Sequence, residues 1–305
     1  MSPPSVLALV PSYNHGSFIR DRVQSILAQT FENFEVDVID DCSTDQTMDV
    51  LKSFSDGRVK TSRRSTNSGS PFSAWLDVSR TLANSNFEYV WIAESDDRAE
   101  PLFLERAVSA LNNNRSASMY YCHSWFIDDS DLIIGHSINY LKRVFPDVEW
   151  DRGWIMSGGD FIRRCLVRGM AIPNMSSALI RAEAFRSAVH SSLARYKLAA
   201  DWVFAIRAAT LGDVIFDPWD GNYFRHHART SRKETDTARM LFEHMSATRT
   251  ALLSGMVDRE TYLEQMRVWT NMYRCEKVRL PDFVKWGWKV SRSDLPACLS
   301  NLATA

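Results

Sequence analysis

Short apolar strands that end in polar loops, two of them acidic, fill the first third of the chain and constrain its fold most. Three of them are Val6–Val10 before Pro11–Gly16, Glu35–Ile39 before Asp40–Asp45, and Tyr89–Ala93 before Glu94–Asp97. Amphipathic segments with helical spacing separate these strands. This alternation is typical of a parallel sheet with helices on its faces. We therefore predict an α/β fold built on a mostly parallel sheet.

Composition excludes several classes of function. Lys and Arg total 36 against 37 Asp and Glu, a net charge of -1, so nothing indicates a nucleic-acid partner. Five cysteines lie without a CxxC pair, which argues against a disulfide framework or a zinc site and favours a reducing, cytoplasmic compartment. No apolar stretch approaches the roughly 20 residues of a membrane span. We expect a soluble protein that acts on small ligands.

The later part of the chain predicts further strands and a helical end. Strand patterns occur at Ser118–Cys122, Ser177–Ile180, Val214–Phe216 and Tyr223–Phe224, and the pattern after about Thr235 indicates two helices. No internal repeat or linker interrupts the chain. We predict one sheet domain over 1–232, with halves 1–115 and 116–232, followed by a helical region over 233–305.

The acidic loops predict a binding site at one edge of the sheet, because neighbouring parallel strands end about 5 Å apart. Asp96 and Asp97 follow a fully apolar strand in a run of four polar residues, which is more than a turn requires. Clustered carboxylates repel one another unless a cation lies between them, and a hard ion such as Mg²⁺ shares carboxylates with substrate phosphates. No Gly-rich phosphate loop is present. The cluster therefore indicates metal-assisted binding of a nucleoside diphosphate.

The second strand ends in acids that we assign different roles. Asp41 is placed to accept a hydrogen bond from a nucleotide base. Asp40 and Asp45 are interpreted as a turn former and a helix cap, and Ser43 or Thr44 is the expected N-cap of the next helix.

Five short motifs follow one another within about the first 110 residues. They are Val10-Pro-Ser-Tyr-Asn14, Gln29-Thr-Phe31, Ile39-Asp-Asp-Cys-Ser-Thr-Asp45, Asn67-Ser-Gly69 and Trp91-Ile-Ala-Glu-Ser-Asp-Asp97. In this order and spacing they resemble the family 2 glycosyltransferases with the GT-A fold. The resemblance implies a nucleotide-sugar donor in the first half and Mn²⁺ or Mg²⁺ on its diphosphate.

The resemblance also implies roles for single side chains. The DxD motif of the family stands here as Glu94-Ser95-Asp96, followed by Asp97, so Asp96 and Asp97 are assigned to ribose and metal. The donor-binding residues that it implies are Pro11, Ser12, Tyr13, Asn14, Asp41, Asn67, Ser95 and Asp96.

The second half resembles the family more loosely. Leu198-Ala-Ala-Asp201-Trp202 is similar to the segment that supplies the catalytic base, although from its position alone Asp201 is equally a helix N-cap. Phe224-Arg225-His226-His227 is similar to a loop over the diphosphate, in which Arg225 would contact phosphate and His227 the metal.

Together these features predict an inverting glycosyltransferase. We expect it to move a sugar from a nucleoside diphosphate sugar, with UDP the first choice, to a glycan or lipid-linked acceptor in bacterial-type polysaccharide or glycolipid synthesis. A sugar nucleotidyltransferase is the first alternative, but it should carry a Gly-rich basic loop after its first strand. A phosphate-responsive regulatory module would need a lysine at a later strand end. A non-catalytic nucleotide-binding scaffold of the same fold is the third alternative.

The C-terminal region carries basic residues together with Trp286 and Trp288. They are Arg267, Arg274, Lys277, Arg279, Lys285, Lys289 and Arg292. A solvated helix face and a peripheral contact with the inner face of an anionic membrane are both compatible with this pattern.

Overall fold

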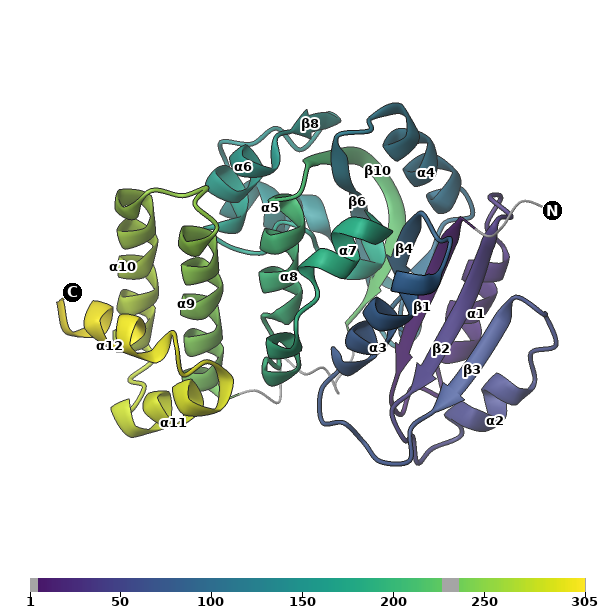
Figure 1. Ribbon diagram of the computed structural model, residues 1–305, viewed down its shortest axis with the longest axis horizontal. Helices are drawn as coiled ribbons and strands as arrows, with labels where there is room; N and C mark the ends of the chain where they lie inside the picture. Colours follow the sequence, from purple (N-terminus) through teal and green to yellow (C-terminus); the bar gives the residue numbers. More distant parts are fainter. Residues whose placement is uncertain (1–4, 227–235, 305) are drawn as a thin grey trace.

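A ten-stranded mixed sheet with helices on both faces forms the body of the protein (Figure 1). The computed structural model describes residues 5–226 and 236–304. The main strand order is β3-β2-β1-β4-β9-β6-β10-β5, with β7 paired to β6 and β8 to β10.

The first half is the predicted parallel unit. Its strands are β1 (Val6–Ser12), β2 (Phe34–Asp40), β3 (Val59–Arg63) and β4 (Tyr89–Ile92). Its helices are α1 (Ile19–Leu27), α2 (Thr47–Lys52), α3 (Ser73–Thr81) and α4 (Phe103–Asn113). The pairs β1–β2, β2–β3 and β1–β4 are all parallel, so the expectation that the three strands with polar loops are adjacent is confirmed.

β1 shows why its sequence is a continuous apolar run. Leu7 and Leu9 enter the core on one face of the sheet, whereas Val6, Ala8 and Val10 enter the core on the other face. Both faces are covered by helices, so both sets of side chains leave water. A strand with one solvated face would instead alternate apolar and polar residues.

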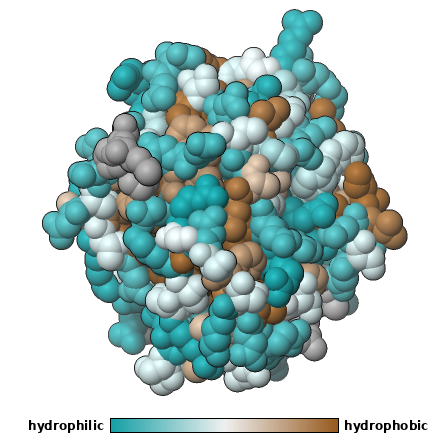
Figure 2. Space-filling model, turned by 90° about the vertical axis from the view of Figure 1, so that its right-hand side faces the viewer, coloured by the Kyte–Doolittle hydropathy of each residue, from teal (hydrophilic) through white to brown (hydrophobic). Residues whose placement is uncertain are grey.

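The edge strand β3 is polar. Four of its five residues are exposed, and Lys60 pairs with Glu35 of β2. The side of the molecule that carries β3 and α2 is mostly hydrophilic, with apolar groups in small patches (Figure 2). Charged side chains on an edge strand oppose pairing with another sheet.

The second half continues the sheet with mostly antiparallel pairs. Its strands are β5 (Arg98–Ala99), β6 (Ala117–Ile127), β7 (Ile133–His136), β8 (Trp154–Met156), β9 (Ala178–Arg181) and β10 (Asp213–Arg225). Its helices are α5 (Ser137–Val144), α6 (Gly158–Phe161), α7 (Ala182–Ala188) and α8 (Ala200–Ala209). β9 joins the halves, because it pairs antiparallel with both β4 and β6.

β10 corrects one sequence prediction. The patterns at 214–216 and 223–224 belong to a single strand of 13 residues, parallel to β6. The ladder shifts register between Asp217 and Asn222, where Pro218 has no amide hydrogen to donate. A Cβ at Gly221 would lie 2.4 Å from the ring of Trp219, so this bend needs glycine.

The C-terminal region has four helices in its described part, 236–304, rather than the two predicted. They are α9 (Thr237–Leu253), α10 (Arg259–Cys275), α11 (Leu280–Val290) and α12 (Leu295–Thr304). Lys277 has a φ of 50°, a left-handed conformation that cannot continue the helix α10. A proline in the first turn favours the start of α11. Among the helices described, none combines the length and apolar composition that spanning a bilayer requires.

Candidate active site

Three polar loops meet at the carboxyl ends of β2, β1 and β4, at the lower side of the sheet in Figure 1. Ser12 at the end of β1 is the register partner of Asp40 at the end of β2, and the Asp41 amide donates to the Ser12 carbonyl at 2.8 Å. The Ala93 amide donates to the Leu9 carbonyl at 2.8 Å. The three loops therefore lie side by side at one edge of the sheet, which is where open α/β sheets bind ligands.

The first loop contains four predicted donor-binding residues. Pro11 is half-buried, Ser12 is buried, and the Tyr13 side chain is 46% exposed. Asn14 adopts a φ of 55°, and its Oδ1 accepts from the Thr44 amide at 2.8 Å. Asn14 thus fastens the first loop to the second.

The second loop brings Asp41 and Asn67 together. The Asp41 carboxylate accepts from the Ser68 amide at 3.0 Å and from its hydroxyl at 2.8 Å, and the Asn67 Nδ2 donates to the Asp41 carbonyl at 3.1 Å. Arg64 lies 3.3 Å from the same carboxylate. Asp41 therefore holds the loop that contains Asn67 in place. In the sequence, Asp41 and Asn67 belong to two separate motifs.

The neighbouring acids have the structural roles predicted for them. Asp40 accepts from the Ser43 amide at 2.9 Å in a buried turn, and Asp45 accepts from the Thr47 amide at 2.9 Å at the start of α2. The prediction of Ser43 or Thr44 as N-cap was wrong, because the N-cap position of α2 is Gln46 and Ser43 donates its hydroxyl to Asp40. The local sequence pattern could not show that the Ser43 hydroxyl forms a hydrogen bond within the turn rather than with the helix.

An acidic cluster follows β4. One carboxylate oxygen from each of Glu94, Asp96 and Asp97 lies within 4.8 Å of the others. Ser95 is buried, and its hydroxyl lies 2.6 Å from Nδ1 of His15. His15 of the first loop was not singled out from the sequence, since a single histidine in a turn carries no pattern.

Asp97 lies deepest in the cluster, with 1% of its surface exposed. Its Oδ1 accepts from the Arg225 amide at 2.9 Å, and its Oδ2 accepts from Nδ2 of Asn174. Asn174 in turn accepts from Asn222 at 2.9 Å. Asp97 is thus tied to both β10 and the segment before β9, whereas Glu94 and Asp96 are half-buried in front of it.

Arg225 was predicted to contact phosphate. In the structure its buried guanidinium donates to the Asp96 carbonyl at 2.7 Å and to the Asp128 carbonyl at 2.6 Å, and it pairs with Asp131. These contacts fix the acidic loop to the β6–β7 hairpin. The predicted metal ligand His227 lies outside the described residues.

Burial and mutual repulsion raise the pKa values of two acids of the cluster. Desolvation, reinforced by the charges of Asp97 and Asp96, raises the pKa of Glu94 well above its usual value. Desolvation and the charge of Asp96 raise the pKa of Asp97 to about 7. Such shifts are typical of functional carboxylates held close together.

A buried arginine lies beside the cluster. Arg22 of α1 has an exposed fraction of 0%, and its guanidinium carbon is 4.6 Å from the centre of the Trp91 ring. Among the described residues, its three guanidinium nitrogens have no hydrogen-bond partner. Burial lowers the pKa of Arg22 to about 10, against the opposing charges of Asp97, Asp96 and Glu94, so it stays charged at neutral pH. The sequence pattern did not reveal this residue.

Asp201 approaches the cluster from the second half. It stands in the first turn of α8, where its Oδ1 accepts from the Trp202 amide at 2.7 Å. Its charge contributes to raising the pKa of Glu94. The fold therefore brings the predicted base near the predicted metal site, although 107 positions separate Asp201 from Glu94 in the sequence.

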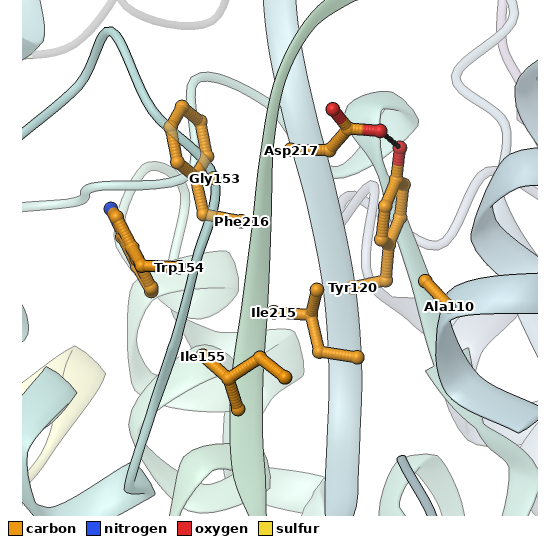
Figure 3. Close-up of a pocket in the computed structure, with 8 residues that line it drawn as sticks. All are labelled: Ala110, Tyr120, Gly153, Trp154, Ile155, Ile215, Phe216 and Asp217. Atoms are coloured by element: carbon orange, nitrogen blue, oxygen red, sulfur yellow. Dashed lines mark hydrogen bonds between the residues drawn. The ribbon is translucent and has the colours of Figure 1, made fainter. Parts of the chain in front are cut away.

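A shallow pocket of about 380 Å³ lies elsewhere on the sheet (Figure 3). Its carboxylate, Asp217, already accepts from Tyr120 at 2.9 Å and from Arg106 at 2.8 Å. Asp217 and Arg225 pair with Cys122 and Ile127 of β6, five positions apart, which is about 16 Å at the rise of a β-strand. This pocket is therefore separate from the acidic cluster.

A parallel sheet half with acidic loops at its carboxyl edge, extended by antiparallel strands, is the GT-A architecture of nucleotide-sugar-dependent transferases. Residues 8–187 match the family described as Glycosyl transferase family 2. The chain belongs to this family.

Two relatives in sequence are named as sugar-transferring enzymes. The chain is 30% identical over 128 residues to the putative teichuronic acid biosynthesis glycosyltransferase TuaG of Bacillus subtilis, covering 41% of this chain and 49% of that protein. It is 32% identical over 111 residues to the poly(ribitol-phosphate) beta-N-acetylglucosaminyltransferase TarS of Staphylococcus aureus, covering 35% of this chain and 19% of TarS. The chain thus spans half or less of these relatives' length.

Solved structures share the fold over more of the chain. The TarS 1–349 complex with UDP-GlcNAc from S. aureus has a TM-score of 0.64 at 18% identity, covering 92% of this chain and 78% of that one. The mannosyltransferase PcManGT of Pyrobaculum calidifontis, solved with GDP-Man and Mn²⁺, has a TM-score of 0.55 at 14% identity, covering 99% and 86%. At these identities the likeness establishes the fold.

The raised pKa of Asp97 predicts how stability depends on pH. Unfolded Asp has a pKa near 3.9, so between about pH 4 and 7 the folded chain binds more protons than the unfolded chain. The contribution of Asp97 to the free energy of unfolding should therefore fall as pH rises through this window, by up to about 4 kcal/mol. Urea unfolding of the wild type and Asp97→Asn at pH 5 and 7 measures it. Equal pH slopes for the two proteins would contradict the assignment.

The position of Arg22 predicts a charge-dependent loss of stability. Arg22→Met keeps the volume but removes the cation beside three carboxylates, and should cost about 2 kcal/mol at pH 7.5. The loss is below that of a broken buried ion pair because an unsatisfied guanidinium is also removed. At pH 5 the cost should shrink, since the carboxylates are then more protonated. Arg20→Met, at an exposed position of the same helix, is the control; a pH-independent loss in Arg22→Met would show a packing role alone.

Proposed function

We propose that this chain is an inverting, metal-dependent glycosyltransferase that uses a UDP-sugar donor. The observation that carries the proposal is the convergence of three polar loops and a carboxylate cluster at adjacent strand ends, with Asp201 approaching from the other half. The TarS structures bound to UDP-GlcNAc and to UDP support the choice of donor.

The donor half, which we assign to residues 1–115, offers groups for each part of a nucleotide sugar. Tyr13 presents an exposed ring on which a base can stack, and Asp41 offers carboxylate oxygens to a base N–H. Asn67 is exposed beside Asp41 and can form a hydrogen bond with the same ligand. Asp96 is half-buried in the acidic loop, beside which we place the ribose and the diphosphate.

The acidic cluster fits a hard divalent cation. All three groups offer carboxylate oxygens, the ligands that Mn²⁺ and Mg²⁺ prefer, within 4.8 Å of one another. Asp96 and Glu94 would hold the ion, with Asp97 behind them and His227 as the further predicted ligand. A bound ion supplies positive charge to a diphosphate leaving group. The Mn²⁺ complex of PcManGT is consistent with this assignment.

Asp201 is the candidate general base. Its carboxylate lies at the start of α8 on the acceptor half, residues 116–232, near the cluster but on a different element. A base there can take the proton of an acceptor hydroxyl as that oxygen attacks the sugar. A single displacement with one base inverts the anomeric configuration, so we assign inversion.

The acceptor is proposed from the relatives' names. TuaG and TarS are named for teichuronic acid and poly(ribitol-phosphate). We infer that the acceptor here is a hydroxyl of a cell-surface glycan or of its lipid-linked precursor. The five cysteines are free thiols in the structure, which supports a reducing, cytoplasmic setting. The helical region over 233–305 would then be an appendage to the catalytic domain.

Donor binding tests the proposed function. Isothermal calorimetry with UDP, GDP, dTDP and CMP should show the tightest binding for UDP, and only with Mn²⁺ or Mg²⁺ present. Asp96→Asn should weaken UDP binding at least tenfold, because it removes a charged ligand of the ion. Asp49→Asn, at an exposed position on α2, is the matched control. Metal-independent binding, or unchanged affinity in Asp96→Asn, would refute the site.

Loss of the base should separate catalysis from binding. Asp201→Asn should lower turnover by roughly 10²–10⁴-fold while the dissociation constant for UDP stays within about twofold. Asp160→Asn, at the start of α6, controls for the loss of an acid in a first helical turn. Transfer at the wild-type rate by Asp201→Asn would exclude Asp201 as the base.

A further inference from the structure

Helix α11 is packed closely on one side. Its residues Phe283, Gly287 and Val290 are buried in the core. A Cβ on Gly287 would lie 2.4 Å from Leu295 and 3.0 Å from Phe242, so α11 approaches both α9 and α12 closely. Phe242 and Phe283 have ring centres 5.3 Å apart. These contacts fix which face of α11 is turned outward.

The opposite face of α11 combines aromatic and basic side chains. Pro281, Lys285, Trp288 and Lys289 are exposed, and their spacing places them on one side of the helix. Trp288 is 55% exposed, and Leu280 beside this stripe is 53% exposed. Arg292, one turn further, has its guanidinium 5.0 Å from the Trp288 ring. We call Leu280, Lys285, Trp288, Lys289 and Arg292 the outer face of α11.

The charge of this region is positive although the chain as a whole carries -1. Between positions 274 and 292 there are six basic residues and two acidic ones, and all six basic residues are exposed. One acid, Asp282, pairs with Arg279 at 2.7 Å. Lys285 and Lys289 lie 5.4 and 5.0 Å from the centre of the Trp286 ring. The basic groups therefore surround an aromatic surface.

Helix α11 lies on the same side of the molecule as the candidate active site. In Figure 1, α11 lies at the lower end of the C-terminal helices, and the carboxyl ends of β1, β2 and β10 point to that side. Trp286 of α11 donates from Nε1 to Asp236 at 3.2 Å, and Asp236 caps α9 only 11 positions after Arg225 ends β10. A surface that held α11 would therefore lie on the side of the molecule that carries the three polar loops.

We propose that the outer face of α11 docks on a membrane surface rich in anionic lipid. Basic side chains complement anionic headgroups, whereas Trp288 and Leu280 offer the apolar groups that enter the headgroup boundary. Tryptophan with flanking cations suits this interface, because its ring is apolar and its N–H stays hydrated. A soluble polyanion would use the charges but would gain nothing from an exposed Trp and Leu. The docking needs neither donor nor metal, so it stands apart from the proposed transfer reaction.

Vesicle sedimentation of the full chain tests the proposal. The wild type should bind vesicles of phosphatidylcholine with phosphatidylglycerol, not bind phosphatidylcholine alone, and lose affinity as salt is raised. Each lost cation should weaken binding roughly fivefold, so Lys285→Gln with Lys289→Gln should weaken it by more than tenfold. Trp288→Ala should also weaken binding at unchanged charge. The matched control is Lys52→Gln with Arg80→Gln, two exposed cations in the first half.

Three results would overturn the membrane assignment. They are no binding of the wild type to anionic vesicles, equal binding by the double lysine variant and the control, and wild-type binding by Trp288→Ala. The last result would identify a site for soluble polyanions, which competition by polyphosphate would confirm. All substituted side chains are exposed, and equal melting temperatures verify the folds. UDP affinity, measured on the same variants, should not change, which separates failure of docking from failure of the donor site.

Discussion

The arrangement of three carboxylates at one strand end depends on a positive charge buried next to them. Arg22 supplies this charge from α1, and its flat guanidinium lies over Trp91 without hydrogen bonds to the described residues. Burying an unpaired guanidinium is costly unless opposite charges are close. The cluster provides those charges, and the arginine in turn favours the ionised forms of Glu94 and Asp97. The acids and the arginine therefore stabilise one another across two elements of the donor half.

A buried polar network connects the two halves of the sheet at the same place. Asp97 accepts from Asn174 and from the amide of Arg225, and Asn174 accepts from Asn222 on β10. The Trp91 indole donates to the Ser176 carbonyl at 2.8 Å, and the Ser176 hydroxyl accepts from the Glu94 amide at 3.0 Å. Such networks hold one geometry when their members are satisfied. The acidic loop thus takes its shape from segments that follow it by 77 residues or more.

This construction gives family 2 membership a physical meaning. The parallel half presents polar loops, the antiparallel half fixes the acidic loop from behind, and α8 brings a carboxylate to the front. The helical region adds α11, with its exposed basic and aromatic residues, on the side of the molecule that carries the polar loops. Each part contributes a surface or a charge to one side of the molecule, which suits the proposed transfer to an acceptor at a membrane.

Local sequence pattern determined the elements and the loops of the first half. Apolar runs with both faces buried could be recognised directly as strands. The ordered motifs located Asp41, Asn67 and the acidic cluster, because loops that follow neighbouring parallel strands lie close together. Only the tertiary structure decided that Asp97 lies behind Asp96, that Arg22 is the buried counter-charge, and that β10 is one strand. Burial and pairing depend on residues far apart in the chain, and periodicity carries no record of them.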